Sequence, residues 1–427
     1  MIILQQTRGL LSSNDELALD LPLAETKSIT ARVGPTPVFT RSSTATFIGS
    51  NGLIQSAAIN EPRFEHDPLT GVCGGLMLEQ SRTNACLQSE NFGTTWTNDT
   101  GLVNITTNVG LSPDGLSTAD KIAENTTLSN RRISIQAQSF AIGTTYTFSC
   151  YVKAAEREFV QLRFGSAFGG QFQNFIVGGV NAGTIGSGVG ATAAIQAYPN
   201  GWYRCSITAV SAATASSNVT IGPQISSTAA PWSPYIGTIG SGIFVWGAQL
   251  EAGATATSYI PTTDGPAVRS QDLYTITGAN FTDMYNQNEG SIFYAVIAVG
   301  ATSAQSGVFG IHSSTRSNGG VFGVFTGNQI TNSVYAASFS SQANFVSATS
   351  RNTLVKNAIA LRTDDFANSF NGDIVTDTSG TLLTIFDRFV IGATGNTGGP
   401  QVGNNIFSSI KYYRKRLPNA KLQALTV

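Results

Sequence analysis

Charge is what this sequence lacks most. Only 11% of its 427 residues are Asp, Glu, Lys or Arg, whereas an ordinary globular protein has about 25%. The 24 basic and 25 acidic residues nearly cancel, so no long-range field concentrates a polyanion or an anionic membrane surface. We therefore expect no nucleic-acid partner and no membrane partner. Ser, Thr, Asn, Gln and Gly must supply most of the surface.

Residues that ligate metals are also scarce. The chain has 4 cysteines, none in a close Cys-x-x-Cys pair, and 2 histidines, His66 and His312. Zinc sites need closely spaced thiolate and imidazole ligands. We therefore expect buried free thiols and assign no metal and no cofactor. The neighbours Asp364 and Asp365 leave either a calcium ion (Ca2+) or a plain surface role open.

Long apolar runs are missing as well. No stretch of about 20 apolar residues occurs, and the first residues have neither the basic nor the apolar region of a signal peptide. We expect a protein that is made in a cytoplasm and does not enter a membrane.

What the sequence does contain is period-two alternation in short runs. In 146–152 and 203–209, apolar residues alternate with polar ones, as in strands that bury one face. If both runs turn their apolar sets inward, Cys150 and Cys205 share a core. Asn-Gly pairs at 51–52, 200–201 and 371–372 predict tight hairpin turns.

Helical periodicity is nearly confined to the end of the chain, where Leu422 and Leu425 within 418–425 predict a short C-terminal helix. The fold class expected is all-β, built from tandem antiparallel β-sandwiches. Composition shifts suggest four parts: an N-terminal arm or attachment segment at 1–30, a module richer in charge and proline at 31–90, and sandwich-sized units at 91–265 and 266–427.

Several motifs resemble bacteriophage proteins. The segments FTRSSTATF at 39–47, NGLI at 51–54, PRFEHDP at 62–68 and EQSRTN at 79–84 resemble a signature of phage tail-fibre and other virion structural proteins. GWYRC at 201–205 and WGAQLE at 246–251 resemble the carbohydrate-binding jelly rolls attached to that signature. The segments 357–361, 389–392 and 410–417 are similar to concanavalin A-like (laminin-G-like) sandwiches.

The resemblance implies a structural protein of the virion, a tail fibre or related appendage, that adheres to host-surface polysaccharide without catalysis. It would contact other virion proteins through its N-terminal segment and form a homo-oligomer, with a trimer favoured by analogy. A capsid-attached head fibre or decoration protein is the first alternative. A depolymerase that cuts host polysaccharide is the second.

Two sets of candidate site residues follow. Glycan binding needs aromatic faces on loops, which favours Trp232, Tyr235 and Trp96, whereas Trp202 and Trp246 are expected to be structural. The second set is expected to form a structural ion-pair cluster, because its charges gather in a chain poor in charge: Arg41, Arg63, Glu65, Asp67, Glu79 and Arg82. No catalytic residue is assigned, since we find no pair of carboxylates suited to glycoside hydrolysis.

Overall fold

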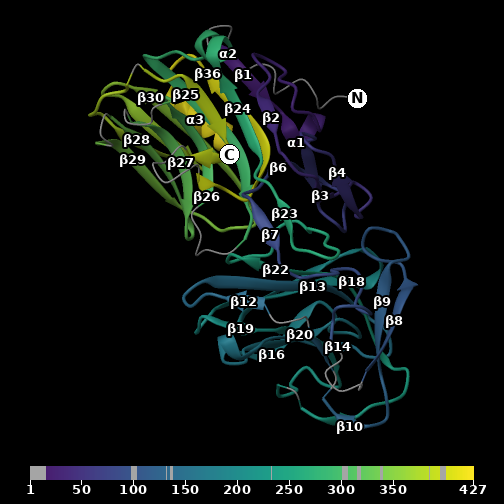
Figure 1. Cartoon of the computed structure of the whole chain (residues 1–427). Helices are drawn as coiled ribbons and strands as arrows, with labels where there is room; N and C mark the ends of the chain where they lie inside the picture. The colour runs from purple at the N-terminus through teal and green to yellow at the C-terminus, as the bar shows by residue number, and fades with distance from the viewer. Residues whose placement is uncertain are drawn as a thin grey trace.

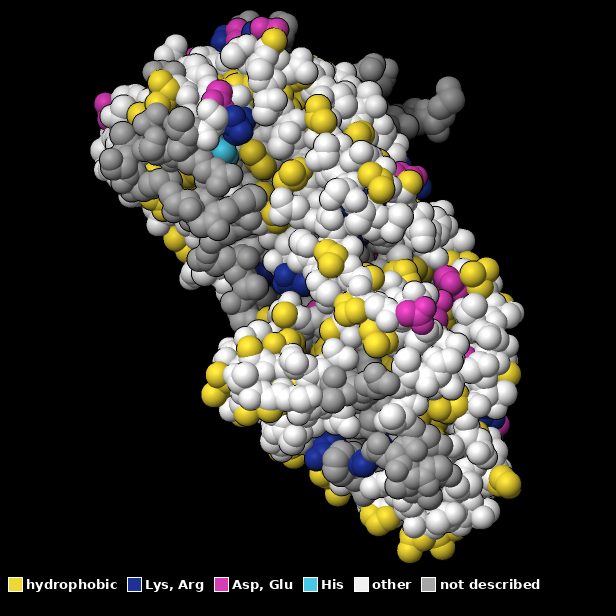
Figure 2. All heavy atoms as spheres, viewed as in Figure 1, with side chains coloured by type: hydrophobic (Ala, Val, Ile, Leu, Met, Phe, Trp, Pro, Cys, Tyr) yellow, Lys and Arg dark blue, Asp and Glu magenta, His cyan; other side chains and the backbone are white. Residues whose placement is uncertain are grey.

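The computed structural model describes residues 16–97, 103–130, 132–134, 138–231, 233–300, 306–314, 319–336, 340–383, 385–394 and 401–427. Strands dominate these residues, and they form two β-sandwiches joined at a narrow waist (Figure 1). The expected all-β fold of tandem antiparallel sandwiches is confirmed. Charged side chains are scattered thinly over the face drawn in Figure 2, in keeping with the composition.

The first of the two bodies, the C-terminal sandwich, packs an eight-stranded sheet on a seven-stranded sheet. The eight-stranded sheet runs β32 (Asp373–Asp377), β31 (Phe366–Phe370), β30 (Leu354–Arg362), β25 (Glu289–Ala298), β36 (Asn405–Tyr413), β6 (Cys73–Leu78) and β5 (Arg63–His66), with β1 (Leu17–Leu21) also paired to β36. The seven-stranded sheet runs β2 (Val38–Thr40), β24 (Leu273–Thr277), β33 (Arg388–Ile391), β26 (Ser306–His312), β27 (Gly320–Thr326), β28 (Gln329–Tyr335) and β29 (Ser341–Ala348).

The N-terminal part of the chain belongs to this sandwich. Strand β1 pairs with β36, β2 pairs with β24, and β6 pairs with β36. Leu19, Leu21 and Leu76 are fully buried in its core. Strand β1 of the first segment and strands β2, β5 and β6 of 31–90 are therefore part of the C-terminal sandwich, and the expectation of a free arm followed by a separate module is wrong for them.

The second body, the inserted sandwich, packs a six-stranded sheet on a five-stranded sheet. The six-stranded sheet runs β17 (Thr192–Ala197), β18 (Trp202–Val210), β13 (Thr145–Ala154), β22 (Gly242–Ala252), β9 (Ala119–Glu124) and β8 (Val103–Gly110). The five-stranded sheet runs β11 (Ile133–Ser134), β20 (Val219–Gln224), β14 (Phe159–Phe164), β15 (Phe172–Ile176) and β16 (Thr184–Val189). Cys150 and Cys205 are direct partners in the β13–β18 register and are fully buried in the core between the sheets, as the alternation predicts.

A two-stranded stalk joins the bodies. The chain leaves the C-terminal sandwich through β7 (Arg82–Asn84) and returns through β23 (Ala267–Arg269), and these strands pair with each other, Asn84 opposite Ala267. They lie at the waist in Figure 1. The sandwich expected at 91–265 is thus an insertion between two parts of a single discontinuous sandwich.

Short elements complete the fold. Four small ribbons pair β3 (Ala45–Ile48) with β4 (Ile54–Ala57), β10 (Leu128–Ser129) with β21 (Tyr235–Ile236), β12 (Gln138–Phe140) with β19 (Ala215–Ser217), and β34 (Ala393–Thr394) with β35 (Gln401–Val402). The helices are α1 (Leu23–Thr26), α2 (Gly278–Met284) and α3 (Asn419–Thr426), with single 3-10 turns at Ser166–Phe168 and Pro199–Gly201. Helix α3 is the expected C-terminal helix and buries Leu422. No helix in the described part is long and apolar enough to cross a bilayer.

The Asn-Gly pairs behave as turn residues. Asn371 and Gly372 both have positive φ, 48° and 84°, and connect β31 to β32. Asn200 and Gly201 also have positive φ, 59° and 77°, between β17 and β18. Both central positions of a type I′ turn require this conformation, so the sequence signal and the backbone agree at these two sites.

Candidate functional site

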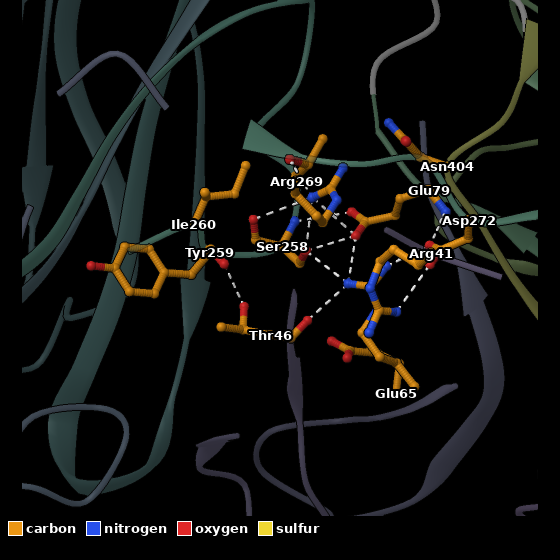
Figure 3. Close-up of polar contacts among 12 residues, drawn as sticks. Arg41, Thr46, Glu65, Glu79, Ser258, Tyr259, Ile260, Arg269, Asp272 and Asn404 are labelled. Carbon is orange, nitrogen blue, oxygen red and sulfur yellow. Dashed lines mark hydrogen bonds and ion pairs between the residues drawn. The ribbon is translucent and has the colours of Figure 1, made fainter. Parts of the chain in front are cut away.

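Three arginines and two carboxylates form a buried cluster where the stalk meets the C-terminal sandwich (Figure 3). Arg63 Nη1 lies 2.8 Å from Glu79 Oε2, and Arg63 Nη2 lies 2.6 Å from Asp272 Oδ2. Arg41 Nη1 lies 3.1 Å from Asp272 Oδ1, and Arg269 Nη1 lies 3.1 Å from Glu79 Oε2. We call these five residues the arginine cluster.

The arginine cluster also holds the loop that ends the inserted sandwich. The Ser258 backbone N–H donates to Glu79 Oε1 at 3.0 Å, and its hydroxyl donates to Oε2 at 2.7 Å. Burial alone would raise the pKa of Glu79, but the guanidinium groups of Arg269 and Arg63, together with these hydrogen bonds, lower it to about 2. Glu79 is therefore an anion with both oxygens occupied, and it fixes the loop to the C-terminal sandwich.

Three residues expected in this cluster lie elsewhere, and the expectation is wrong for them. Glu65 makes no ion pair with any described residue and accepts a hydrogen bond from the Ile48 backbone N–H at 2.8 Å. Asp67 is exposed and accepts the Thr70 backbone N–H within its own turn. Arg82 donates to the carbonyl of its neighbour Ser81 and has no carboxylate within 4.0 Å in the described part of the chain.

Two members of the arginine cluster, Arg269 and Asp272, were not expected from the sequence. They lie about 190 residues beyond Glu79 in the sequence, and only the return of the chain through β23 brings them back to it. The criterion that selected Arg63 could also have selected Arg269 and Asp272, because they too are two charged residues close together in a chain poor in charge.

A cavity of about 840 Å³ lies beside the arginine cluster, between the two sandwiches. Its walls come from the inserted sandwich, from the hairpin β3–β4 with the end of β5, and from the C-terminal sandwich around Ile297, Asn352 and Asn404. We call it the junction cavity. Pockets of roughly 300–1,000 Å³ hold most small ligands of proteins, so its size is that of a small-ligand site.

The floor of the junction cavity is the outer face of the six-stranded sheet. Because Cys205 and Ile207 point into the core, the residues that alternate with them point outward. They form cross-strand rows that contain Thr192 with Thr208, Ala194 with Ser206, and Gln196 with Arg204. The floor is thus a ladder of hydroxyl and amide groups.

The wall formed by the hairpin β3–β4 and the end of β5 includes an aromatic residue and a carboxyl group. Phe47 on β3 is half-buried and lines the cavity. Glu65, at the end of β5, lines the same wall, and burial raises its pKa to about 8. At neutral pH the Glu65 carboxyl is therefore protonated and can donate a hydrogen bond.

The aromatic residues expected to stack on sugar do not meet at this cavity. Trp96 is only 3% exposed, packs on Phe92 with ring centroids 4.8 Å apart, and donates its indole N–H to the Gln88 carbonyl at 3.2 Å. Tyr235 is buried, and its hydroxyl donates to Glu124 Oε1. Neither ring presents a face to solvent, which corrects the expectation for both, and Trp232 lies outside the described residues.

Other residues singled out by the sequence have structural partners. Trp202 and Trp246 are 1% exposed, as expected of structural tryptophans. Of the two carboxylates considered for calcium, Asp365 pairs with Arg362 and Arg416, and Asp364 accepts the Gly380 backbone N–H. Among the described residues, no group of three or more His, Cys, Asp or Glu is placed to hold a metal ion.

No protein-family model matches the chain, and no curated protein matches it. Among solved structures, the chain is similar to the CBM40 module of the Ruminococcus gnavus IT-sialidase bound to α2,3-sialyllactose, with 13% identity and a TM-score of 0.32 over 36% of this chain and 92% of that one. It is also similar to the binding domain of botulinum neurotoxin DC in complex with rat synaptotagmin II, with 11% identity and a TM-score of 0.30 over 36% and 40% of the two chains. Likenesses this distant say nothing about what the chain binds.

Proposed function

We propose that this chain is a non-catalytic adhesin that holds host-surface glycan in the junction cavity and serves as a structural protein of a virion. The observation that supports glycan binding is the chemistry of the cavity. A floor of hydroxyl and amide groups and the half-buried residue Phe47 line the same cavity. Sugars present hydroxyls that hydrogen-bond to such a floor and C–H faces that pack on an aromatic ring.

The junction cavity is also held rigidly. The arginine cluster ties the loop at Ser258, one wall of the cavity, to strands on the other side of the stalk. A preorganised site loses less conformational entropy when it binds. The cluster therefore serves binding through the rigidity it gives the cavity.

Binding without cleavage is part of the proposal. Glycoside hydrolysis usually needs two carboxyl groups, one protonated and one free to act as base or nucleophile. Glu65 meets the first condition, since burial keeps its pKa near 8. Glu79 does not meet the second, because Arg63, Arg269 and Ser258 occupy its oxygens. A depolymerase remains the competing function, and release of reducing ends from host polysaccharide would favour it.

The virion role is supported by the motifs at 39–47, 51–54, 62–68 and 79–84, which resemble the phage signature. A tail fibre or related appendage is the proposed setting, with a capsid-attached head fibre as the alternative. A homotrimer would display three cavities, and linked sites raise the effective concentration enough that weak sites suffice. Other virion proteins would be contacted through the N-terminal segment.

The test is glycan-array binding by the full chain displayed in multiple copies. Ala194→Trp fills the cavity from an exposed position on its floor, and Phe47→Ala removes the aromatic wall. We expect both variants to lose most of the binding. Val189→Trp, which adds the same ring at an exposed site on β16 outside the cavity, is the matched control. Full binding by Ala194→Trp with an unchanged fold would remove the junction cavity as the site.

A further inference from the structure

Arg204 is a buried cation in the junction cavity. It is 9% exposed and its guanidinium lies 5.2 Å from the ring centre of Tyr151. Its Nη1 donates to the Thr257 carbonyl at 2.7 Å, its Nη2 donates to the Ser149 hydroxyl at 3.1 Å, and its buried Nε has no hydrogen-bond partner. All of these partners are neutral.

No carboxylate of the described chain lies within 4.0 Å of Arg204. A buried charge without a counter-ion is costly, and arginine stays protonated in proteins. The other buried arginines near the cavity, Arg41, Arg63 and Arg269, all have carboxylate partners. Arg204 is therefore exceptional among them.

The neighbouring charges compensate only in part for Arg204. The buried carboxylate of Glu251 is near enough to raise the pKa of Arg204, but it accepts the backbone N–H and the hydroxyl of Thr257 and makes no ion pair with the guanidinium. The arginine cluster itself pairs three guanidinium groups with two carboxylates. Glu65 carries no charge at neutral pH, since burial holds its pKa near 8. Asp67 lines the cavity but is exposed and occupied within its own turn. Four buried guanidinium groups, those of Arg41, Arg63, Arg204 and Arg269, are therefore set against three buried carboxylates, those of Glu79, Asp272 and Glu251.

We infer that the junction cavity takes a carboxylate-bearing sugar, such as a uronic acid, with the sugar carboxylate as the counter-ion of Arg204. A planar guanidinium matches a carboxylate in shape and charge. Glu65, as a neutral acid, can donate to the same ligand, and the hydroxyl ladder of Thr192, Ser206 and Thr208 accepts the sugar hydroxyls. This inference rests on the proposed function and adds the class of glycan.

The overall charge of the chain, formally −1 at pH 7, gives no long-range attraction for such a ligand. The preference must therefore arise from contact inside the cavity, where the dielectric is low. Binding should then respond to the removal of one carboxyl group from the ligand, and only weakly to moderate salt.

The experiment measures binding of the full chain to oligosaccharides that contain uronic acids or other carboxylated sugars, each compared with its own methyl ester. The ester keeps the size and the hydroxyls but loses the charge. We expect the acid form to bind about tenfold tighter, as for a hydrogen bond between charged groups. This comparison needs only the wild-type chain, so it does not depend on the folding of a variant.

Arg204→Gln is then expected to reduce the tenfold preference to about one. Arg32→Gln, at an exposed ion pair outside the cavity, is the control and should keep the preference. Equal binding of acid and ester by the wild-type chain, or equal preference for sulfated neutral sugars, would overturn the inference.

The outcomes separate this inference from the proposed function. If Ala194→Trp blocks glycan binding but the wild-type chain binds acid and ester equally, the inference is overturned and the proposed function stays in place. The absence of any glycan binding overturns both.

Discussion

The guanidinium group of Arg63 lies 2.6 Å from the carboxylate of Asp272, although 209 residues separate them in the chain. The whole inserted sandwich is folded between them. Arg63 lies on β5, and Asp272 precedes β24, so the pair joins the two segments of the discontinuous C-terminal sandwich. The contact forms only when the chain has returned through the stalk.

Loss of Arg63 should therefore destabilise the C-terminal sandwich. Arg63→Gln leaves Glu79 and Asp272 buried with fewer partners, and removing one partner of a buried ion pair costs about 3–5 kcal/mol. We expect this decrease in the free energy of unfolding, measured by denaturant titration.

The control for that measurement is Lys415→Gln, because the side chains of Lys415 and its partner Glu16 are both exposed. Exposed ion pairs contribute about 0–1 kcal/mol. Equal effects of the two substitutions would contradict a structural role for the arginine cluster.

The sequence predicted local structure well and long-range pairing poorly. Alternation around Cys150 and Cys205 placed both thiols on one face, because side-chain direction depends only on the period of a strand. The pairing of β1 and β6 with β36 could not be predicted, since it depends on contacts across more than 300 residues. For the same reason Asp272 was not expected in the ion-pair cluster, since 193 residues separate it from Glu79.

The stacking residues were predicted wrongly for a different reason. Polar neighbours around Trp96 and Tyr235 indicated exposed loops. In the structure, backbone turns bring Trp96 onto Phe92, and hydrogen bonds of the Tyr235 hydroxyl to Glu124 and to the Pro223 carbonyl allow Tyr235 to be buried. Phe47, by contrast, is half-buried and is one of the residues that line the cavity, and its strand context gave no sign of that.

Glu65 should make stability depend on pH in the alkaline range. Because burial raises its pKa from 4.5 to about 8, the folded protein holds a proton that the unfolded chain releases. This contribution to stability is complete below about pH 4.5 and is lost as the pH rises through 8. Glu65→Gln keeps an acceptor for the Ile48 N–H and has no charge to bury.

We therefore expect Glu65→Gln to exceed the wild-type chain in free energy of unfolding by about 4 kcal/mol at pH 9. At pH 5 the two should be nearly equal. Denaturant titrations at both pH values measure the difference, with Glu158→Gln at an exposed position as the control. A constant difference at both pH values would contradict a neutral Glu65.

The four thiols should differ sharply in reactivity. Cys86, Cys150 and Cys205 are fully buried, and burial raises the pKa of Cys150 to about 12, whereas Cys73 is partly exposed. Thiolates are the reactive form, so a pulse of iodoacetamide on the folded chain should label Cys73 alone.

Mass spectrometry of the labelled chain counts the modified thiols. We expect one label in the native state and four after denaturation, and Cys73→Ser should reduce both numbers by one. Native labelling of Cys150 or Cys205 would show that the core of the inserted sandwich is open.

Asn332 connects the two sheets of the C-terminal sandwich through a buried polar network. Its side-chain oxygen accepts the Tyr294 hydroxyl at 2.9 Å, and its side-chain nitrogen donates to Asn357 Oδ1 and Asn368 Oδ1, each at 2.9 Å. Leucine has nearly the same volume as asparagine but cannot hydrogen-bond, so Tyr294, Asn357 and Asn368 would each lose the bond to residue 332. Unsatisfied buried polar groups cost about 1–3 kcal/mol each, so we expect Asn332→Leu to lower the free energy of unfolding by about 3 kcal/mol or more.

Tyr294→Phe removes one hydrogen bond of that network and should cost about 1 kcal/mol. If the Tyr294 hydroxyl acts through Asn332, the double variant should be less destabilised than the sum of the single variants, because the bond is already lost in either one. Asn328→Ala, at an exposed position between β27 and β28, serves as the control for substitutions of asparagine in this sandwich. Strictly additive costs in urea titrations would mean that the hydroxyl and the amide do not stabilise each other, and the network would then not explain how the two sheets are held in register.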